Sequence, residues 1–179
     1  MSPAGAPARP VVVLVGPMGS GKTTVGRLLA ARLGVALRDT DADVEARAGK
    51  PVSDIFVDDG EPVFRDLERE AVAAALAEHP GVLALGGGAV MDPLTEQGLH
   101  GHAVVFLDVQ VVDAARRIGL NRDRPLLLGN PRAQWLRIME RRRPVYERVA
   151  TAVVATDDRT PEQVADVVLD ALGLKEEQP

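Results

Sequence analysis

The sequence predicts an α/β fold, a three-layer sandwich in which helices cover both faces of a mostly parallel sheet. Apolar runs rich in β-branched residues alternate along the chain with segments of helical periodicity, and this alternation requires right-handed crossovers between parallel strands. The first apolar run, VVVLV, also leads through GPMGSGKTT into a helical pattern. This order of strand, glycine-rich turn and helix is typical of phosphate-binding folds.

The expected elements follow from hydrophobic periodicity. Strands are expected near 11–15, 35–38, 82–85, 103–107 and 152–155. Helices are expected near 22–33, 61–78, 110–118, 131–142 and 161–172. The last helix has the clearest signals, because Thr160 and Gln163 form a capping box around Pro161.

The chain length predicts a single domain. A chain of 179 residues with 46% hydrophobic content is long enough for one compact α/β domain and short for two, and we place that domain at residues 10–173. Residues 1–9 are mostly small residues and prolines, so we expect a disordered tail, and we expect a short C-terminal tail at 174–179. The stretch 118–131, IGLNRDRPLLLGNP, is too polar and irregular for a core and is expected to be a mobile loop.

Composition limits the partners. A net charge of -5 argues against nucleic acid as the main partner, because duplex binding usually needs a basic surface. The absence of cysteine excludes disulfides and thiolate metal sites, and no stretch resembles a secretory signal or a membrane span. We therefore expect a cytoplasmic protein without a nucleic-acid or membrane partner, and a monomer by default.

The stretch GPMGSGKTT fits the pattern G-x-x-x-x-G-K-[ST], with Gly16, Gly21, Lys22 and Thr23 in the fixed places. Successive N–H groups over 19–24 can converge on phosphate oxygens at a helix N-terminus, where the helix dipole favours negative charge. Lys22 is expected to bridge the β- and γ-phosphates, and the Thr23 hydroxyl to hold Mg²⁺. The alternative is a simple glycine turn with a solvated lysine, which does not require the full pattern.

Two carboxylates follow the second expected strand. If residues 35–39 are extended, Asp39 and Asp41 project to the same side at the carboxyl end of a strand, where open α/β sheets bind ligands. One can hold the Mg²⁺ shell through water, and the other can accept a proton from an attacking hydroxyl. Asp41 can equally cap a helix over 42–48. Asp108, which ends the apolar run VVFLD, is a rival for the metal role.

Three consecutive glycines at 86–88 follow the expected strand at 82–85. Glycine has no side chain to pack and loses more conformational entropy on folding than other residues, but it lets another group come close to the backbone. We therefore expect a ligand to dock against these glycines. The stretch is not a dinucleotide fingerprint, because Met91 stands where the third glycine of G-x-G-x-x-G would fall.

Several arginines are candidate anion ligands. Arg65 and Glu68 are three residues apart on one expected helix stripe, so by themselves they indicate an ion pair at least as well as a ligand site. The run at 141–143 precedes Pro144, which is expected to end a helix. A solvated basic helix end accounts for at least two of these three arginines.

Together the stretches GPMGSGKTT, DTD, FRDLE, LGGGAV, RDRPLL, RRPVY and TPEQV resemble the shikimate kinase family, and the similarity covers nearly the whole chain after the tail. The resemblance implies a P-loop fold like that of nucleoside monophosphate kinases, with a five-stranded parallel sheet and a lid near 118–131. It implies transfer of the γ-phosphoryl group of ATP, with Mg²⁺, to the 3-hydroxyl of shikimate, in the route to chorismate and the aromatic amino acids.

The resemblance also implies roles for single residues. Asp41 would withdraw the hydroxyl proton and Arg124 would reach the phosphates from the lid, while Thr23 and, through water, Asp39 would hold Mg²⁺. The implied nucleotide site consists of Gly19, Ser20, Gly21, Lys22, Thr23, Thr24, Arg117, Arg124 and Arg159. The implied substrate site consists of Asp41, Arg65, Gly86, Gly87, Gly88, Arg142, Phe56 and Phe64. In it Arg65 and Arg142 would clamp the shikimate carboxylate; alignment on PVY selects Arg142 and leaves Arg143 as an extra.

Three other functions fit the sequence less well. A GTP-driven switch would need a guanine-reading N-K-x-D, which the chain does not contain. A gluconate kinase of the same fold would not require two arginines that converge on a carboxylate. A non-catalytic nucleotide-binding protein would need neither Asp41 nor the glycines at 86–88.

Overall fold

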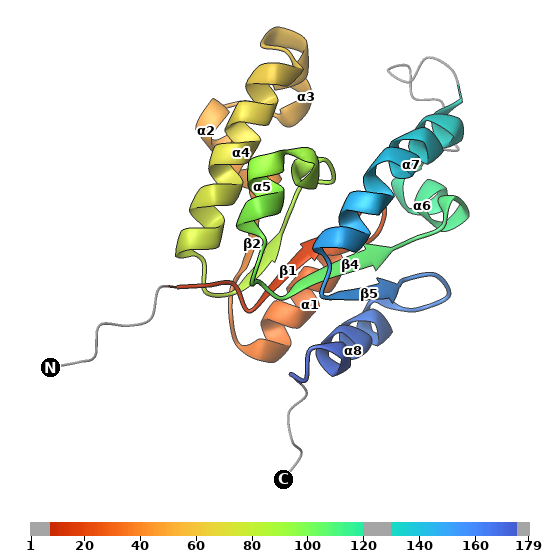
Figure 1. Ribbon diagram of the computed structural model, residues 1–179. Coiled ribbons are helices and arrows are strands. Elements are labelled where there is room, and N and C mark those ends of the chain that lie inside the picture. Colours follow the sequence, from red (N-terminus) through yellow and green to blue (C-terminus); the bar gives the residue numbers. More distant parts are fainter. Residues whose placement is uncertain (1–7, 120–129, 175–179) are drawn as a thin grey trace, which may run out of the picture.

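The computed structural model describes residues 8–119 and 130–174, and these form an α/β three-layer sandwich (Figure 1). The described sheet has five parallel strands in the order β2-β3-β1-β4-β5. The strands are β1 (Val12–Val15), β2 (Leu37–Asp39), β3 (Val82–Ala84), β4 (Val104–Asp108) and β5 (Ala152–Ala155). The predicted fold class is confirmed, and the carboxyl ends of all five strands share one edge.

Helices flank the sheet on both faces. They are α1 (Lys22–Leu33), α2 (Thr40–Ala48), α3 (Val52–Asp58), α4 (Glu61–Glu78), α5 (Pro93–Gly98), α6 (Val111–Ile118), α7 (Pro131–Val149) and α8 (Pro161–Ala171), with a 3₁₀ turn η1 (Ala89–Met91). Figure 1 shows α1 and α8 on one face of the sheet and α4, α5 and α7 on the other. No helix of the described ranges is long and apolar enough to span a membrane.

Strand β1 lies between two apolar clusters because its side chains alternate across the sheet. Val12 and Leu14 pack with residues of α1 and α8, whereas Val13 and Val15 pack with residues of α4 and α7. All four side chains are buried. The VVVLV run is therefore uniformly apolar because both of its faces are covered.

A third, smaller cluster joins α2, α3 and α4 beyond the edge of the sheet. Its buried members are Val44, Ile55, Phe64 and Ala71. Figure 1 shows these three helices stacked together, away from α7. They form the wall of a compartment that faces the carboxyl edge of the sheet.

The expected helix end at Pro144 is wrong, since α7 continues through it to Val149. Proline removes one backbone hydrogen bond and its ring crowds the preceding turn. Tertiary packing offsets this cost, because Met139 before the proline and Tyr146 after it are both buried in the same cluster. A local helix-breaking signal is overridden here by burial on both sides.

Other boundaries also differ from expectation. Strand β2 begins at Leu37 rather than at residue 35, and Asp39, not Asp41, caps α2, since its Oδ1 accepts the backbone N–H of Asp41 at 2.9 Å. Helices α3 and α5 and the turn η1 were not expected. The short α5 does carry a readable signal, because Asp92 caps it and Pro93 follows at the first helical position.

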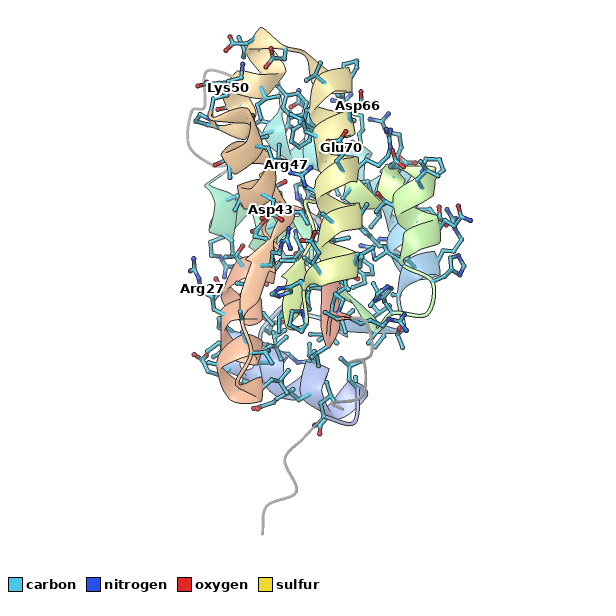
Figure 2. All side chains as sticks on the ribbon, turned by 90° about the vertical axis from the view of Figure 1, so that its left-hand side faces the viewer. Arg27, Asp43, Arg47, Lys50, Asp66 and Glu70 are labelled. Atoms are coloured by element: carbon cyan, nitrogen blue, oxygen red, sulfur yellow. The ribbon has the colours of Figure 1, made fainter. Side chains whose placement is uncertain are left out.

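The outer face of α2 and α4 carries charges of both signs, and Figure 2 views the molecule with this face toward the reader. Arg47 of α2 lies beside Glu70 of α4 at 3.5 Å, and Lys50 lies 2.6 Å from Asp59. Exposed pairs of this kind contribute at most about 1 kcal/mol each. This face is therefore a solvated surface whose pairs add modestly to the packing of α2 on α4.

Asp92 connects α4 to α5 through hydrogen bonds, and its substitution is expected to weaken the packing of these two helices. Its Oδ1 accepts N–H groups of Leu94 and Thr95, and its Oδ2 accepts Nε of Arg69 at 2.6 Å. Asp92→Ala should lower the free energy of unfolding by about 1 kcal/mol, a usual loss for a helix cap. Asp92→Asn should cost less because the amide oxygen still caps the helix. Denaturant unfolding measures both, with exposed Asp66→Asn as the control expected to have little effect.

The same contact predicts a pH dependence. Burial acts to raise the pKa of Asp92, but hydrogen bonds from Arg69 and from two backbone N–H groups outweigh it and lower that pKa. A lowered carboxyl pKa contributes stability that is present above about pH 4 and is lost as the pH falls through the native value. The difference in stability between the wild-type protein and Asp92→Asn should therefore shrink below about pH 4; a constant difference would contradict the assignment.

Candidate active site

The loop between β1 and α1 has the geometry of a phosphate cradle. Gly19 and Gly21 have φ of 84° and 90°, in the left-handed region that side chains rarely adopt. A methyl group added at Gly19 would also lie 3.1 Å from the Cα of Ala114 in α6. The loop therefore needs glycine at these positions, and it leaves backbone N–H groups at the start of α1 free to face an anion.

Lys22 is the first residue of α1 and reaches back over the loop. Its Nζ donates hydrogen bonds to the carbonyl oxygens of Gly16 at 2.7 Å and Pro17 at 3.1 Å. Burial lowers the pKa of Lys22 to about 8, against the opposing effect of the Asp41 and Asp39 carboxylates. An arriving phosphate would stabilise the charged form of this lysine.

Thr23 and Asp39 meet beside the cradle, where the Thr23 hydroxyl donates to Asp39 Oδ2 at 3.4 Å. The described residues contain no group of three or more His, Asp or Glu side chains that could hold a metal ion alone. Mg²⁺ is usually held by one or two protein oxygen ligands together with waters and substrate phosphates. A hydroxyl and a carboxylate next to a phosphate cradle fit that requirement.

Across the cavity, the three glycines after β3 are closely approached by charged side chains. A methyl group added at Gly86 would lie 2.5 Å from Oδ1 of Asp41 and 3.0 Å from Oε2 of Glu68. One added at Gly88 would lie 2.6 Å from Nη1 of Arg65 and 3.0 Å from Nη2 of Arg142. The absence of side chains at 86–88 is what allows these groups to converge, and docking of a ligand against the glycines stays a prediction.

Arg65 and Glu68 lie on the face of α4 that turns toward the glycines. Arg65 Nη1 lies 2.7 Å from Glu68 Oε1, so the expected ion pair is present. Both residues nevertheless line the cavity, and Glu68 is only 3% exposed. Burial raises the pKa of Glu68, while the hydrogen bond and charge of Arg65 act to lower it. The pair is thus part of the cavity lining, and the ion pair does not prevent Arg65 from facing a ligand.

Asp41 occupies the first turn of α2 at the junction of the two halves of the cavity. Burial raises its pKa, the Asp39 carboxylate adds to that effect, and Lys22 opposes it. A carboxylate with a raised pKa is a better proton acceptor than an ordinary one. Its place between the cradle and the glycines suits a base that acts on a hydroxyl near a phosphate.

These groups line one cavity of about 660 Å³. The P-loop residues from Gly19 to Thr24 line one part of it, and its other lining residues include Asp39, Asp41, Phe64, Arg65, Gly86 and Arg142. The predicted wall residue Phe56 is absent from the described lining; its ring packs 4.6 Å from that of Phe64. Fold topology has thus brought together nearly all of the described residues that the sequence singled out.

Arg117 and Arg159 line the same cavity. Arg117 donates to the carbonyl of Gly19 at 3.1 Å and to Oγ1 of Thr156 at 3.0 Å, which ties the end of α6 to the cradle. Arg159 donates to the carbonyl of Ala155 at the end of β5. Arg124 and most of the expected lid at 118–131 lie outside the described residues.

The run of three arginines divides between different partners. Arg142 lines the cavity beside the glycines, whereas Arg143 makes two hydrogen bonds of 2.9 Å to the two carboxylate oxygens of Asp108. Among the described residues Asp108 is not part of the cavity lining. A metal role is therefore better matched by Asp39, which faces Thr23.

Tyr146 and Trp135 make contacts at the cavity that were not expected from the sequence. The Tyr146 hydroxyl donates to the carbonyl of Gly87, and Trp135 Nε1 donates to the carbonyl of Met18 at 3.0 Å. Both aromatic residues lie on α7, and their spacing of 11 residues, close to three helical turns, places them on the same face of one helix. This shared face could not be recognised from the sequence, because the helix was expected to end before Pro144, between the two residues.

A phosphate cradle that opens into a second, charged compartment defines a P-loop kinase that acts on a small molecule. The model of the shikimate kinase family matches residues 18–173. Shikimate kinase from Streptomyces avermitilis is 62% identical over 167 residues, 93% of this chain and 98% of that protein. Shikimate kinase from Salinispora arenicola is 64% identical over 156 residues, 87% of this chain and 93% of that protein.

A solved structure agrees with these relatives. Shikimate kinase from Acinetobacter baumannii, in complex with shikimate, superposes with a TM-score of 0.86 at 32% identity, over 96% of each chain. The chain belongs to the shikimate kinase family and is an ATP-dependent small-molecule kinase.

Proposed function

We propose that this protein transfers the γ-phosphoryl group of ATP to the 3-hydroxyl of shikimate, giving shikimate 3-phosphate and ADP, in the route to chorismate and the aromatic amino acids. The observation that carries the proposal is the approach of Arg65 and Arg142 to one point above Gly88. Two guanidinium groups at one position in a partly buried compartment are suited to a carboxylate on a small cyclic acceptor. The family of the chain and its likeness to a shikimate complex support the same acceptor.

The chemistry of the two arginines favours a carboxylate over a neutral sugar. A guanidinium presents planar N–H donors that match both oxygens of a carboxylate, and lysine does not reproduce that geometry. Glu68 holds Arg65 in place at 2.7 Å, so little conformational freedom remains for this side chain to lose on binding. A gluconate kinase would share the phosphate cradle and the acidic residues of the protein. Its acceptor, however, carries its carboxylate on a longer, flexible chain, which the site would also have to accommodate.

In the proposed reaction, Asp41 accepts the proton of the acceptor hydroxyl as its oxygen bonds to the γ-phosphorus. The bond from that phosphorus to the β,γ-bridging oxygen breaks, and that oxygen leaves with ADP. Lys22 and the N–H groups at the start of α1 neutralise the phosphate oxygens. Mg²⁺, held by Thr23 and through water by Asp39, would supply further positive charge to the phosphates.

The residues of the nucleotide end complete the proposal. Arg117 and Arg159 would contact the nucleotide beyond the cradle, and Arg124 would reach the phosphates from the lid. A lid that completes the site only when the acceptor is bound would keep water from competing as the phosphoryl acceptor. We also propose that the protein works in the cytoplasm, where ATP is available, and as a monomer, which sedimentation of the purified protein would test.

Acceptor identity is tested directly with purified protein, ATP and Mg²⁺. ADP release should depend on shikimate and should not occur with gluconate, because only the cyclic acid offers a rigid carboxylate to Arg65 and Arg142. Coupled measurement of ADP, with the phosphorylated product identified by mass spectrometry, provides the readout. ADP release with gluconate alone would overturn the proposal.

Asp41→Asn should lower kcat by roughly 10²–10⁴-fold, the usual contribution of a positioned base, and should leave ADP affinity nearly unchanged. Because burial raises the pKa of Asp41, the wild-type rate should rise with pH as this carboxyl loses its proton. The variant should lack that rise. An unchanged kcat, measured by steady-state kinetics, would show that Asp41 is not the base.

Arg142→Ala should raise the KM for shikimate by roughly tenfold to a hundredfold, which corresponds to the loss of about 1.5–3 kcal/mol of charge-assisted hydrogen bonding. The KM for ATP should change little. Exposed Arg141→Ala is the matched control, because it removes the same charge from the preceding position of α7. Equal effects of the two substitutions would indicate a general electrostatic role and not a specific clamp.

A further inference from the structure

In helix α7, Arg142 lies two residues before Pro144, a proline inside the helix. Pro144 has no N–H group, so the carbonyl of Glu140 cannot accept the helical hydrogen bond from that position. The hydrogen-bond ladder that would normally fix the orientation of residues 140–144 is therefore incomplete. Some other contact has to hold this turn if Arg142 is to keep a defined direction.

Arg143 supplies such a contact on the β4 side of the helix. Its Nη1 lies 2.9 Å from Oδ2 of Asp108 and its Nη2 lies 2.9 Å from Oδ1, a bidentate pair with defined geometry. The guanidinium also lies over the ring of Phe106, 5.7 Å from its centroid. Asp108 is itself fixed, because it ends β4 and accepts the N–H of Val109.

Tyr146 supplies a second contact on the other side of the proline. Its hydroxyl donates to the carbonyl of Gly87, and its ring stacks on Phe106 with centroids 4.9 Å apart. Arg143 and Tyr146 thus connect the turn around Pro144 to the end of β4 and to the glycines after β3. Arg142 projects from this same turn toward Gly87 and Gly88.

We infer that the ion pair between Arg143 and Asp108 is a positioning device for Arg142, which fixes the turn of α7 so that the Arg142 guanidinium meets the acceptor carboxylate. The inference rests on the proposed function, because it assigns that ligand to Arg142. It gives a role to two residues that the proposed reaction does not use. A misplacement of about 1 Å can cost a reacting complex much of its rate or affinity, so such a device has a measurable effect.

The pair has a second, electrostatic consequence. Asp108 neutralises Arg143, which is next to Arg142 in the sequence but is not part of the cavity lining. Without Asp108 the bidentate pair is lost, and among the described residues Arg143 keeps a longer ion contact of 3.8 Å with Glu147, so its guanidinium is less firmly directed away from the cavity. Removal of either partner therefore disturbs acceptor binding, although only Arg143 carries positive charge.

The competing explanation is that the pair only stabilises the fold, as a partly exposed ion pair of modest strength. The two explanations differ in which kinetic constant changes. A positioning role weakens binding of the acceptor specifically. A stabilising role lowers the melting temperature and leaves the kinetic constants of the folded protein unchanged.

The test compares Arg143→Gln, Asp108→Asn and the double variant, measured with shikimate and ATP at a temperature well below their melting points. Each single variant should raise the KM for shikimate by roughly three- to tenfold, and the double variant should show no further rise, because both changes remove one interaction. The KM for ATP and kcat should stay within about twofold, since the Asp108 carbonyl that accepts from Thr156 near the nucleotide end is retained. Arg143→Lys, which keeps the charge without the bidentate geometry, should fall between wild type and Arg143→Gln.

The matched control is the ion pair of Arg32 in α1 with Asp166 in α8, which lies on the opposite face of the sheet. Arg32→Gln and Asp166→Asn should leave the KM for shikimate unchanged whatever they do to the melting temperature. Unchanged shikimate KM in the Arg143 and Asp108 variants would overturn the inference, as would additive effects in the double variant. An effect of Arg143→Gln without one of Asp108→Asn would also overturn it, because Arg143 would then contact the acceptor itself. Absence of shikimate turnover in the wild-type protein would instead contradict the proposed function.

Discussion

Charges of both signs share one cavity at the carboxyl edge of the sheet, and the rest of the site depends on their balance. They include the cations Lys22, Arg65 and Arg142 and the carboxylates Asp39, Asp41 and Glu68. Burial lowers the pKa of Lys22 and raises those of Asp41 and Glu68, so desolvation is only partly offset in the free protein. A ligand that brings phosphates to the lysine and a carboxylate to the arginines would offset the remaining desolvation cost of these cations. The charges of the site are therefore complementary to a ligand of that kind.

Parallel strand topology is what allows this arrangement. The carboxyl ends of β1, β2 and β3 lie side by side. Strand β1 leads into the phosphate cradle, β2 ends at Asp39, and β3 leads into the glycines at 86–88. Each strand end contributes one part of the cavity, and the sheet fixes their separation through its hydrogen-bonded register. The uniformly apolar β1, buried on both faces, anchors this edge and keeps the cradle from shifting relative to its neighbours.

Helix α7 links the two ends of the cavity. Trp135 in its first half donates to the carbonyl of Met18 in the cradle, and Tyr146 in its second half donates to the carbonyl of Gly87. One helix thus touches both the phosphate cradle and the glycines at 86–88, and it carries Arg142 between them. In the proposed reaction, such a helix would help to keep the acceptor and the phosphate chain in line, which is the main requirement of phosphoryl transfer.

The sequence by itself determined the fold class and the phosphate cradle, because both are local: periodicity sets the elements, and G-x-x-x-x-G-K-[ST] sets a turn within nine residues. It also marked Asp41 and Arg65 as candidates without deciding between a structural and a chemical role. The family resemblance already favoured Arg142 over Arg143, but only the tertiary structure shows why the two side chains separate, and that α7 continues through Pro144. Those outcomes depend on contacts with Asp108 and with strands far away in the chain, which no local pattern encodes. Burial across the sheet outweighed the local propensity of the proline, and the register of one helix against β4 assigned each arginine its partner.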